Sequence, residues 1–480
     1  MMKKNSVKQN YIFNTLYQIF SMVIPFFMIP YISRVLGPEN IGAYGYAASI
    51  VSGFALVGSM GVKLYGQREI AYVQDDKKKR SKKFWEIFAL RAITSVLSFT
   101  IFFILFILRQ NQYTILFIIL NLELLTNIFD ISWFFQGMEE FKKITIRNSL
   151  IKIISIIPIF VFVRTSNDLI PYVAIYAISN LVGSLSLWPF LPKYVERIKL
   201  NRMKILHHLK PTFLLFLPQA AAQVYTVLDT TMLGALISNK AEVGYYEQAQ
   251  KMINLLIAII ISLSTVMMPK IANCISKKSN KINYYMEKSF EAIFMLALPI
   301  VFGLIACANS FVPLFFGEGF DKTAILLQIM AVVLLFVGLA SIVGIQYLIP
   351  SRRQNQYTVS VVVAAVVNII FNSIFIPICG SLGAAMGTVI AEGVGIVIQL
   401  FIVRKDLNIK KMLGVSVKYF VAAVIMFATC ELLNLLNVPP VAKVVLQILI
   451  GSILYVVLLA LFRAKLFIET LQHVWKKVRR

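Results

Sequence analysis

The chain has 480 residues, of which 59% are hydrophobic and only 14% charged, and it carries a formal net charge of +25. A soluble protein of this length would need more charged residues to cover its surface, so the composition excludes an ordinary soluble domain. The apolar residues occur in runs of about 20, enough for a helix to cross a hydrocarbon core of roughly 30 Å. The sequence therefore predicts an all-α, polytopic membrane protein, whose excess of basic residues anchors loops rather than binding nucleic acid.

Fourteen apolar segments predict fourteen transmembrane helices. In chain order they are 11–33, 41–62, 87–108, 113–135, 148–164, 170–191, 211–236, 243–268, 289–311, 324–348, 357–379, 382–403, 416–436 and 441–462. With the N-terminus in the cytoplasm, 40 of the 47 Lys and Arg residues fall in cytoplasmic segments and five in external loops. Because basic residues accumulate on the cytoplasmic side of membrane proteins, both termini are expected in the cytoplasm, at the plasma membrane.

A short phrase occurs twice in the sequence. G-x-Y-x-x-A at residues 42–47 returns at residues 244–249, and a Leu-Gly pair precedes each copy. Six predicted spans separate the copies, and an even number keeps both halves in the same orientation. The phrase thus favours a parallel repeat of two six-helix lobes. We expect an N-lobe at 1–200 (helices 1–6), a C-lobe at 201–405 (helices 7–12), and helices 13–14 with a basic cytoplasmic tail at 406–480.

Four glycines in and before the repeated phrase have predicted roles. Gly37 and Gly234 fall where helices are expected to end, which suits a cap with a positive φ angle. Gly42 and Gly244 open the following helices, where a missing side chain allows two helices to approach closely.

Four stretches together resemble a known family. They are "IPYISRVLGPENIGAYGYAASIV", "LYGQREIAYVQDD", "DISWFFQGMEEFKK" and "LDTTMLGALISNKAEVGYYEQAQKM". They look like polysaccharide flippases, which move repeat units of O-antigen, capsule and exopolysaccharide, within the multidrug/oligosaccharidyl-lipid/polysaccharide exporter superfamily. The resemblance implies two lobes in a V shape, alternating access and an undecaprenyl-diphosphate-linked oligosaccharide as substrate. It also implies the polymerase and chain-length machinery as partners.

Ionisable residues inside membrane spans are costly and therefore candidates for function. Glu123, Asn127 and Asp130 have the i, i+4, i+7 spacing of one helical face, with Glu123 near the middle of its span. The stripe is expected to line a cavity or a cation-coupling site for H⁺ or Na⁺. The alternative is that its members form hydrogen bonds or salt bridges that order the lobe.

Further polar residues lie in the predicted second half. Glu392 shares a face with Thr388, Gly395 and Gln399, whereas Asn368, Asp229 and Lys251 lie in three other spans. These four, Glu392, Asn368, Asp229 and Lys251, are candidate cavity residues. For Lys251 the alternative is a local i, i+4 ion pair with Glu247.

A lipid diphosphate would need cations, and arginine can grip phosphate through two parallel hydrogen bonds. Arg34, Arg91, Lys152 and Lys251 are the best available, in spans or at their ends, and Arg34 and Lys251 are taken as candidate site residues. The sequence does not single out a diphosphate site. Pro25, Pro30 and Pro218 are expected to act as hinges, or else as passive kinks, because proline removes a backbone donor from a helix.

Other chemistry finds little support in the sequence. The four cysteines are scattered and are expected to be free thiols, and the three histidines fall in polar connections, which argues against a buried histidine relay. No phosphate-binding G-x-x-x-x-G-K-[ST] loop occurs, and no metal or other cofactor is expected. The alternatives to a flippase are a cation-coupled multidrug exporter of the same superfamily and a membrane glycosyltransferase or polymerase. The external loops are too short to suit the last of these.

Overall fold

A computed structural model describes residues 7–198, 203–277, 279 and 281–478. These residues form helices and connecting turns, with no strand among them. They divide into an N-terminal unit, Met1–Gly244, and a C-terminal unit, Tyr245–Arg480. The two units are described separately below.

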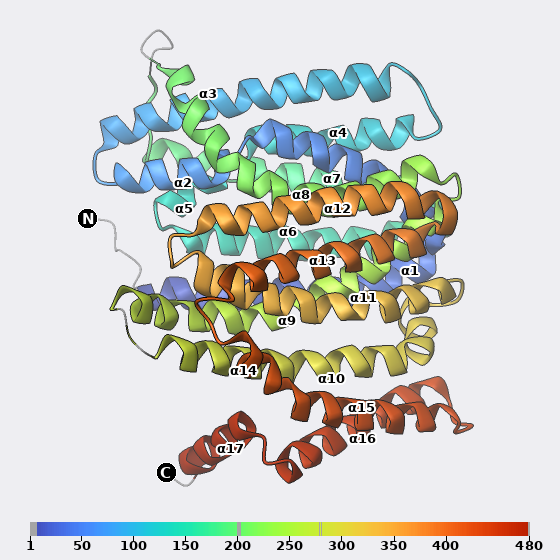
Figure 1. Cartoon of the computed structure of the whole chain (residues 1–480). Coiled ribbons are helices and arrows are strands. Elements are labelled where there is room, and N and C mark those ends of the chain that lie inside the picture. Colours follow the sequence, from blue (N-terminus) through green and yellow to red (C-terminus); the bar gives the residue numbers. More distant parts are fainter. Residues whose placement is uncertain (1–6, 199–202, 278, 280, 479–480) are drawn as a thin grey trace. The chain divides into compact units, whose positions relative to one another are not determined.

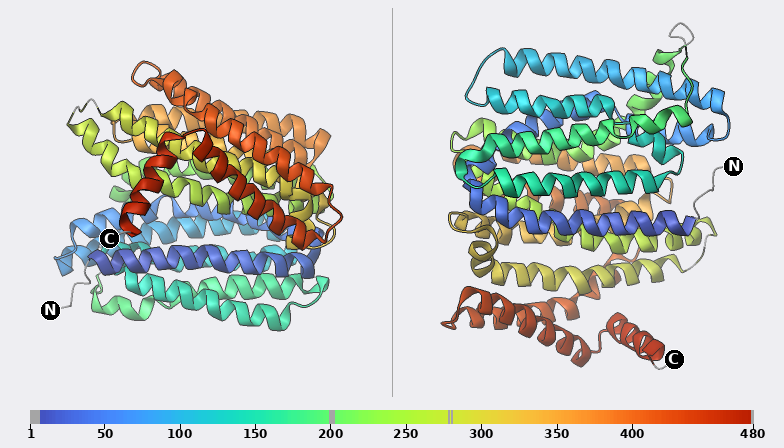
Figure 2. Two further views of the ribbon diagram at one scale, coloured as in Figure 1. Left: turned by 90° about the horizontal axis from the view of Figure 1, so that it is seen from below. Right: turned by 180° about the vertical axis from the view of Figure 1, so that it is seen from behind.

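The N-terminal unit is a bundle of long helices with short connecting elements. In chain order its α-helices are α1 (Val7–Ser59), α2 (Val62–Tyr72), α3 (Lys77–Phe102), α4 (Thr114–Phe129), α5 (Ser132–Gly137), α6 (Phe141–Phe162), α7 (Leu169–Leu185) and α8 (Leu209–Leu236). Within this unit α4 packs against α1 and α7, and α6 packs against α1 and α7. Figures 1 and 2 show α3, α4, α6 and α7 running side by side.

The C-terminal unit contains nearly all of α9 and the remaining helices. They are α9 (Ala241–Ser276), α10 (Ile282–Phe316), α11 (Asp321–Ala340), α12 (Gln354–Cys379), α13 (Ser381–Val403), α14 (Ile409–Gly414), α15 (Ser416–Asn434), α16 (Pro440–Leu461) and α17 (Lys465–Val478). A π-helical segment, Ser341–Leu348, follows α11 directly. α12 packs along α13, and α15 and α16 pack against α10.

The prediction of a polytopic helical membrane protein is confirmed. Twelve helices among the described residues are long and apolar enough to cross a membrane. Two predicted spans, 11–33 and 41–62, lie in the single element α1, which Gly37 interrupts with φ 74° and ψ 170°. In α8 the described apolar stretch, Val227–Leu236, is too short for a helix that crosses a membrane. The count of fourteen therefore stays a prediction, as do the two repeat lobes and the boundary at residue 200.

Gly42 and Gly244, the first residues of the two copies of the repeated phrase, lie close together within the N-terminal unit. A Cβ at Gly42 would overlap the Lys240 carbonyl oxygen, and one at Gly244 would overlap the Pro38 carbonyl oxygen. The predicted close approach at these glycines is therefore confirmed, because only glycine leaves room for backbone on backbone.

The other two glycines behave differently from each other. Gly37 has the expected positive φ angle. Gly234 does not, and the prediction of a cap there was wrong, because Gly234 lies inside α8. Its missing side chain instead makes room for the Tyr46 ring, which a Cβ would overlap. The end of α8 is capped by a side chain: Lys240 Nζ donates to the carbonyl oxygens of Gly234, at 2.5 Å, and Ile237, at 3.0 Å. Burial lowers the pKa of Lys240.

The position of all three histidines in polar connections argued against a buried histidine relay, yet one histidine is buried. His208 is only 1% exposed. Its Nε2 lies 3.0 Å from Glu86 Oε2 and its Nδ1 lies 2.7 Å from the Tyr65 hydroxyl. Burial lowers the pKa of His208, although the hydrogen bond to Glu86 opposes this shift. Hydropathy could not reveal the burial, because a connection between spans can fold onto the ends of α2 and α3. The prediction of free cysteines is confirmed for all four.

Candidate functional site

A polar cavity of about 450 Å³ lies inside the N-terminal unit, among α1, α4, α6 and α7. Its lining combines carboxylates, cations, amides and hydroxyls, and consists of Ala55, Glu123, Thr126, Asn127, Asp130, Arg147, Asn148, Ile151, Lys152, Tyr176, Asn180 and Ser184. All four helices are among those long and apolar enough to cross a membrane. A polar cavity of this kind inside a membrane bundle is where water or a polar ligand can be accommodated.

α4 supplies one wall of the cavity. Glu123, Asn127 and Asp130 all line it, so the three candidates that share a predicted face do lie together. Glu123 is half-buried, about 14 Å from the start of α4 at 1.5 Å per residue. Among the described residues, Glu123 forms no hydrogen bond and no ion pair. Its carboxyl group is therefore available to a ligand or an ion in the cavity.

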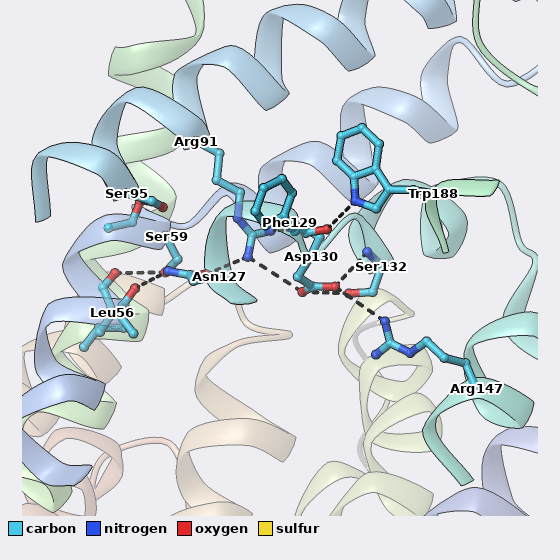
Figure 3. A network of polar contacts seen from close by, with 12 residues as sticks. Leu56, Ser59, Arg91, Ser95, Asn127, Phe129, Asp130, Ser132, Arg147 and Trp188 are labelled. Carbon is cyan, nitrogen blue, oxygen red and sulfur yellow. Dashed lines mark hydrogen bonds and ion pairs between the residues drawn. The ribbon is translucent and has the colours of Figure 1, made fainter. Parts of the chain in front are cut away.

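Asp130 lies just beyond the end of α4, between two arginines (Figure 3). Its carboxylate is 3.7 Å from the Arg91 guanidinium and 3.8 Å from that of Arg147. The same carboxylate accepts hydrogen bonds from the Ser132 backbone N–H at 2.9 Å and the Ser132 hydroxyl at 3.0 Å. The Asp130 side chain thus holds Ser132, the first residue of α5, and joins α3 to α6, a largely structural position.

Arg91 extends this network to α4 and α1 (Figure 3). Arg91 is 3% exposed, and its guanidinium donates to Asn127 Oδ1 at 2.6 Å and to the Asp130 carbonyl oxygen at 2.8 Å. Asn127 in turn donates to the Ala55 carbonyl oxygen at 2.8 Å. A buried charge is strongly disfavoured unless it has partners, and these hydrogen bonds supply them for Arg91. The same hydrogen bonds hold α1, α3 and α4 together beside the cavity.

α6 and α7 supply the opposite walls. Arg147 and Lys152 extend from α6, and Tyr176, Asn180 and Ser184 form one i, i+4, i+8 face of α7. Arg147 was not among the predicted site residues, because the span predicted there begins at residue 148, whereas α6 begins at Phe141. A basic residue just before an apolar run lowers the local hydropathy but can still belong to the same helix. The position of Arg147 directly before the predicted span was the signal that could have identified it.

Two candidates of the C-terminal unit, Asn368 and Glu392, lie on α12 and α13, which pack along each other. Asn368 and Asn372 are fully buried on α12, and Asn372 donates to Asn368 at 3.2 Å. On α13, Glu392 is half-buried and Gln399 donates to the Ser360 hydroxyl at 3.1 Å. The Gln399–Ser360 hydrogen bond joins α13 to α12, whereas the asparagine pair lies within α12.

The remaining candidates lie apart from the cavity lining. Lys251 forms the expected i, i+4 ion pair with Glu247, at 2.7 Å on α9. Arg34 is exposed on α1, and Asp229 is fully buried on α8. Of the proposed hinges, Pro30 lies in α1 in helical backbone, since Gly37 is the interruption that α1 contains. The side chains of Pro25 and Pro218 lie outside the described residues.

Within the described part of the chain, no group of three or more His, Cys, Asp or Glu side chains is placed to hold a metal ion. The side chains that line the cavity offer hydrogen bonds and charges to a ligand. The cavity volume falls in the range of about 300–1,000 Å³ typical of small-ligand sites. The cavity can enclose a sugar or a phosphate group, but not a whole lipid-linked oligosaccharide.

Residues 7–275 of this chain match the family described as polysaccharide biosynthesis protein. The chain belongs to this family. The match includes the whole cavity, because every lining residue falls between Ala55 and Ser184. The resemblance found in the sequence is thereby confirmed.

Relatives of this polysaccharide biosynthesis protein carry the names of transporters and glycan proteins. It is 22% identical over 408 residues to a putative O-antigen transporter of Escherichia coli K12, covering 84% of this chain and 98% of the relative. It is 24% identical over 406 residues to the capsular polysaccharide biosynthesis protein CapF of Staphylococcus aureus, covering 82% and 98%. Its fold is similar to that of the lipid II flippase MurJ in an inward closed conformation, with a TM-score of 0.75, 20% identity, and coverage of 94% and 98%.

Proposed function

We propose that this protein is a flippase that moves lipid-linked oligosaccharide repeat units from the cytoplasmic to the outer leaflet of the plasma membrane. The substrate would be an oligosaccharide on undecaprenyl diphosphate, moved by alternating access for the synthesis of a surface polysaccharide. The observation that carries the proposal is a polar cavity, with cations and carboxylates, inside a membrane bundle of a polysaccharide biosynthesis protein. The names of its relatives, an O-antigen transporter and a capsular polysaccharide biosynthesis protein, support a role in glycan transport.

The cavity is proposed to bind one polar part of the substrate. Arg147 and Lys152 can donate to phosphate oxygens, and arginine can do so through two parallel hydrogen bonds. Asn148, Asn180 and Tyr176 offer donors and acceptors to sugar hydroxyls. The lipid tail would stay in the bilayer, because the cavity is too small for it and the tail loses nothing there.

The membrane arrangement is part of the proposal. It has fourteen crossings, two parallel six-helix lobes and both termini in the cytoplasm. The break at Gly37 supports the separation of the first two crossings, and the distribution of Lys and Arg supports the orientation. No chemical step on the substrate is proposed.

Cation-coupled export of small molecules is the second candidate. The observation that favours it is Glu123, a half-buried carboxyl group in the cavity with no ion pair among the described residues. Such a group can take up H⁺ or Na⁺ in one state and release it in another. The same coupling could also drive a flippase, so the two candidates differ in their cargo rather than in the use of Glu123.

The deciding experiment is deletion of the gene, followed by measurement of lipid-linked oligosaccharides in each leaflet. A flippase predicts accumulation of complete repeat units that only cytoplasmic enzymes can reach, and restoration by the wild-type gene. A deletion strain with normal lipid-linked intermediates but greater sensitivity to toxic cations would favour the exporter instead.

The orientation has a separate test in a cysteine-free background. Ser238 lies in an exposed turn after α8, and Lys78 lies exposed at the start of α3. A thiol reagent that does not cross membranes should label Ser238→Cys in intact cells and should label Lys78→Cys only after lysis. Reversed labelling would refute both the orientation and the count of crossings.

A further inference from the structure

A second pocket, of about 400 Å³, lies entirely in the C-terminal unit. Its walls come from α9, α10, the π-helical segment Ser341–Leu348 and the first turn of α17. The lining is mostly apolar, with Leu263, Val266 and Met267 on the α9 side. The polysaccharide biosynthesis family match ends at residue 275, so most of this pocket lies outside it.

Two buried polar side chains line this pocket without hydrogen-bond partners. Ser289 is 4% exposed and Gln346 is 1% exposed. Neither the Ser289 Oγ nor the Gln346 Oε1 finds a partner among the described residues. A buried polar group without a partner is costly, and most such groups in proteins are satisfied by protein, water or ligand. The pair therefore points to an occupant that both donates and accepts hydrogen bonds.

The pocket also has one cation that no carboxylate neutralises. Lys288 is held by Glu291 at 3.4 Å and by Glu469 of α17 at 2.8 Å. Lys270 forms no ion pair within the described part of the chain, and its Nζ lies 4.4 Å from the centre of the Tyr285 ring. Lys270 is thus placed to attract an anion at the mouth of the pocket.

α17 closes one side of the pocket through its first turn. The Leu466 backbone N–H donates to Glu291 Oε1 at 3.0 Å, and the Tyr419 hydroxyl donates to the same oxygen at 2.7 Å. α17 begins four residues after the membrane helix α16 ends. The pocket therefore lies near one membrane surface, which the charge distribution predicts to be the cytoplasmic one.

We propose that this pocket binds an anionic glycerophospholipid with a hydroxyl-bearing headgroup, such as phosphatidylglycerol. The phosphate accepts hydrogen bonds from Lys270 and Ser289, and the headgroup hydroxyls exchange hydrogen bonds with the Gln346 amide. The glycerol and the first part of an acyl chain lie against Val266 and Met267. A choline headgroup fits poorly, because it carries no donor and its positive charge meets Lys270. This proposal does not depend on the cargo of the N-terminal cavity.

The test uses the full-length protein, purified in detergent and mixed with phosphatidylglycerol or phosphatidylcholine at equal concentrations, with native mass spectrometry as the readout. Wild-type protein should retain phosphatidylglycerol about tenfold more strongly. Lys270→Gln and Gln346→Leu should each weaken that retention by about tenfold, the size expected for a lost charge-assisted or buried hydrogen bond. Lys277→Gln, at an exposed lysine beyond α9, is the matched control and should retain the lipid as the wild type does.

Three results would overturn the proposal. Equal retention of the two lipids would mean that the pocket holds water or detergent without selectivity. Displacement of phosphatidylglycerol by excess inorganic phosphate would mean a simple anion site. Unchanged retention in Lys270→Gln would place the lipid elsewhere, and this exposed lysine can be changed without loss of the fold. Size-exclusion profiles should show that every variant is folded.

Discussion

Polar residues at helical spacing occur in both units, on α4 and on α12, yet they end in different environments. On α4 and at its C-terminal end, Glu123, Asn127 and Asp130 border a cavity of about 450 Å³. On α12, Asn368 and Asn372 are fully buried and bonded to each other. The spacing is similar, and the difference comes from the helices that pack against each stripe.

The neighbouring helices differ in side-chain size and charge. α4 packs against α7, and α6, which also packs against α7, brings the long cationic side chains of Arg147 and Lys152 into the cavity. α12 instead faces Gly387 of α13, where a Cβ would overlap Asn372 Oδ1. Glycine therefore lets the two helices approach closely over the amides. In this protein the stripe on α4 lies beside long charged side chains, whereas the asparagines of α12 lie beside a glycine.

Removal of Arg91 should have the largest effect in this comparison. Arg91→Leu leaves the buried end of the network without its cation, so Asp130 loses one of its two arginines and Asn127 loses a donor. We expect the free energy of unfolding to fall by about 3–5 kcal/mol. Denaturation of the purified protein in detergent measures this. Arg109→Leu, at an exposed arginine, serves as the control, and an equally stable Arg91→Leu protein would mean that the network does not support the bundle.

Replacement of Asn368 should have a smaller effect, confined to stability. Asn368→Leu removes the hydrogen bond that the Asn372 amide donates to Asn368 and puts a branched apolar side chain in a fully buried polar position. We expect a loss of about 1–3 kcal/mol in the free energy of unfolding, with unchanged transport per folded molecule. Ser373→Ala, on the exposed side of the same helix, is the control. A well-folded Asn368→Leu protein that no longer transports would make the α12 amides part of the translocation path.

Replacement of Glu123 should give the opposite pattern. Glu123→Gln keeps the size and polarity of the side chain and breaks no ion pair among the described residues. We expect transport to fall by about tenfold, equivalent to about 1.4 kcal/mol, while the free energy of unfolding changes by less than about 0.5 kcal/mol. Transport is measured as restoration of surface polysaccharide in the deletion strain, with Glu39→Gln as an exposed control. A fully active variant would make Glu123 a bystander in the cavity.

The Glu247–Lys251 pair should contribute least to stability. A double-mutant cycle with Glu247→Gln and Lys251→Gln should give a coupling of about 0.3–0.5 kcal/mol, because the pair is an i, i+4 contact with a partly exposed lysine. If the pair is only local, the double variant should transport normally. A folded but inactive double variant would instead assign Lys251 to the substrate path, and Lys251→Arg would then test whether the shape of the cation matters.

Much of the architecture was determined by local sequence. Apolar runs of about 20 residues specify membrane helices whatever their neighbours, because the bilayer demands internal hydrogen bonding of the backbone. A close contact could be predicted at Gly42 and Gly244 because each is the first residue of the repeated G-x-Y-x-x-A phrase. The face shared by Glu123, Asn127 and Asp130 followed from the helical period alone.

Only the tertiary structure decided which polar residues meet. Arg147 contacts Asp130 because α6 begins at Phe141, several residues before the apolar run from which the span was predicted. His208 is buried because its connection folds onto α2 and α3, and Gly234 accommodates Tyr46 instead of ending a helix. Each of these outcomes depends on contacts between residues far apart in the chain. The helical period fixes the direction of a side chain on its own helix, whereas the packing of helices fixes what that side chain contacts.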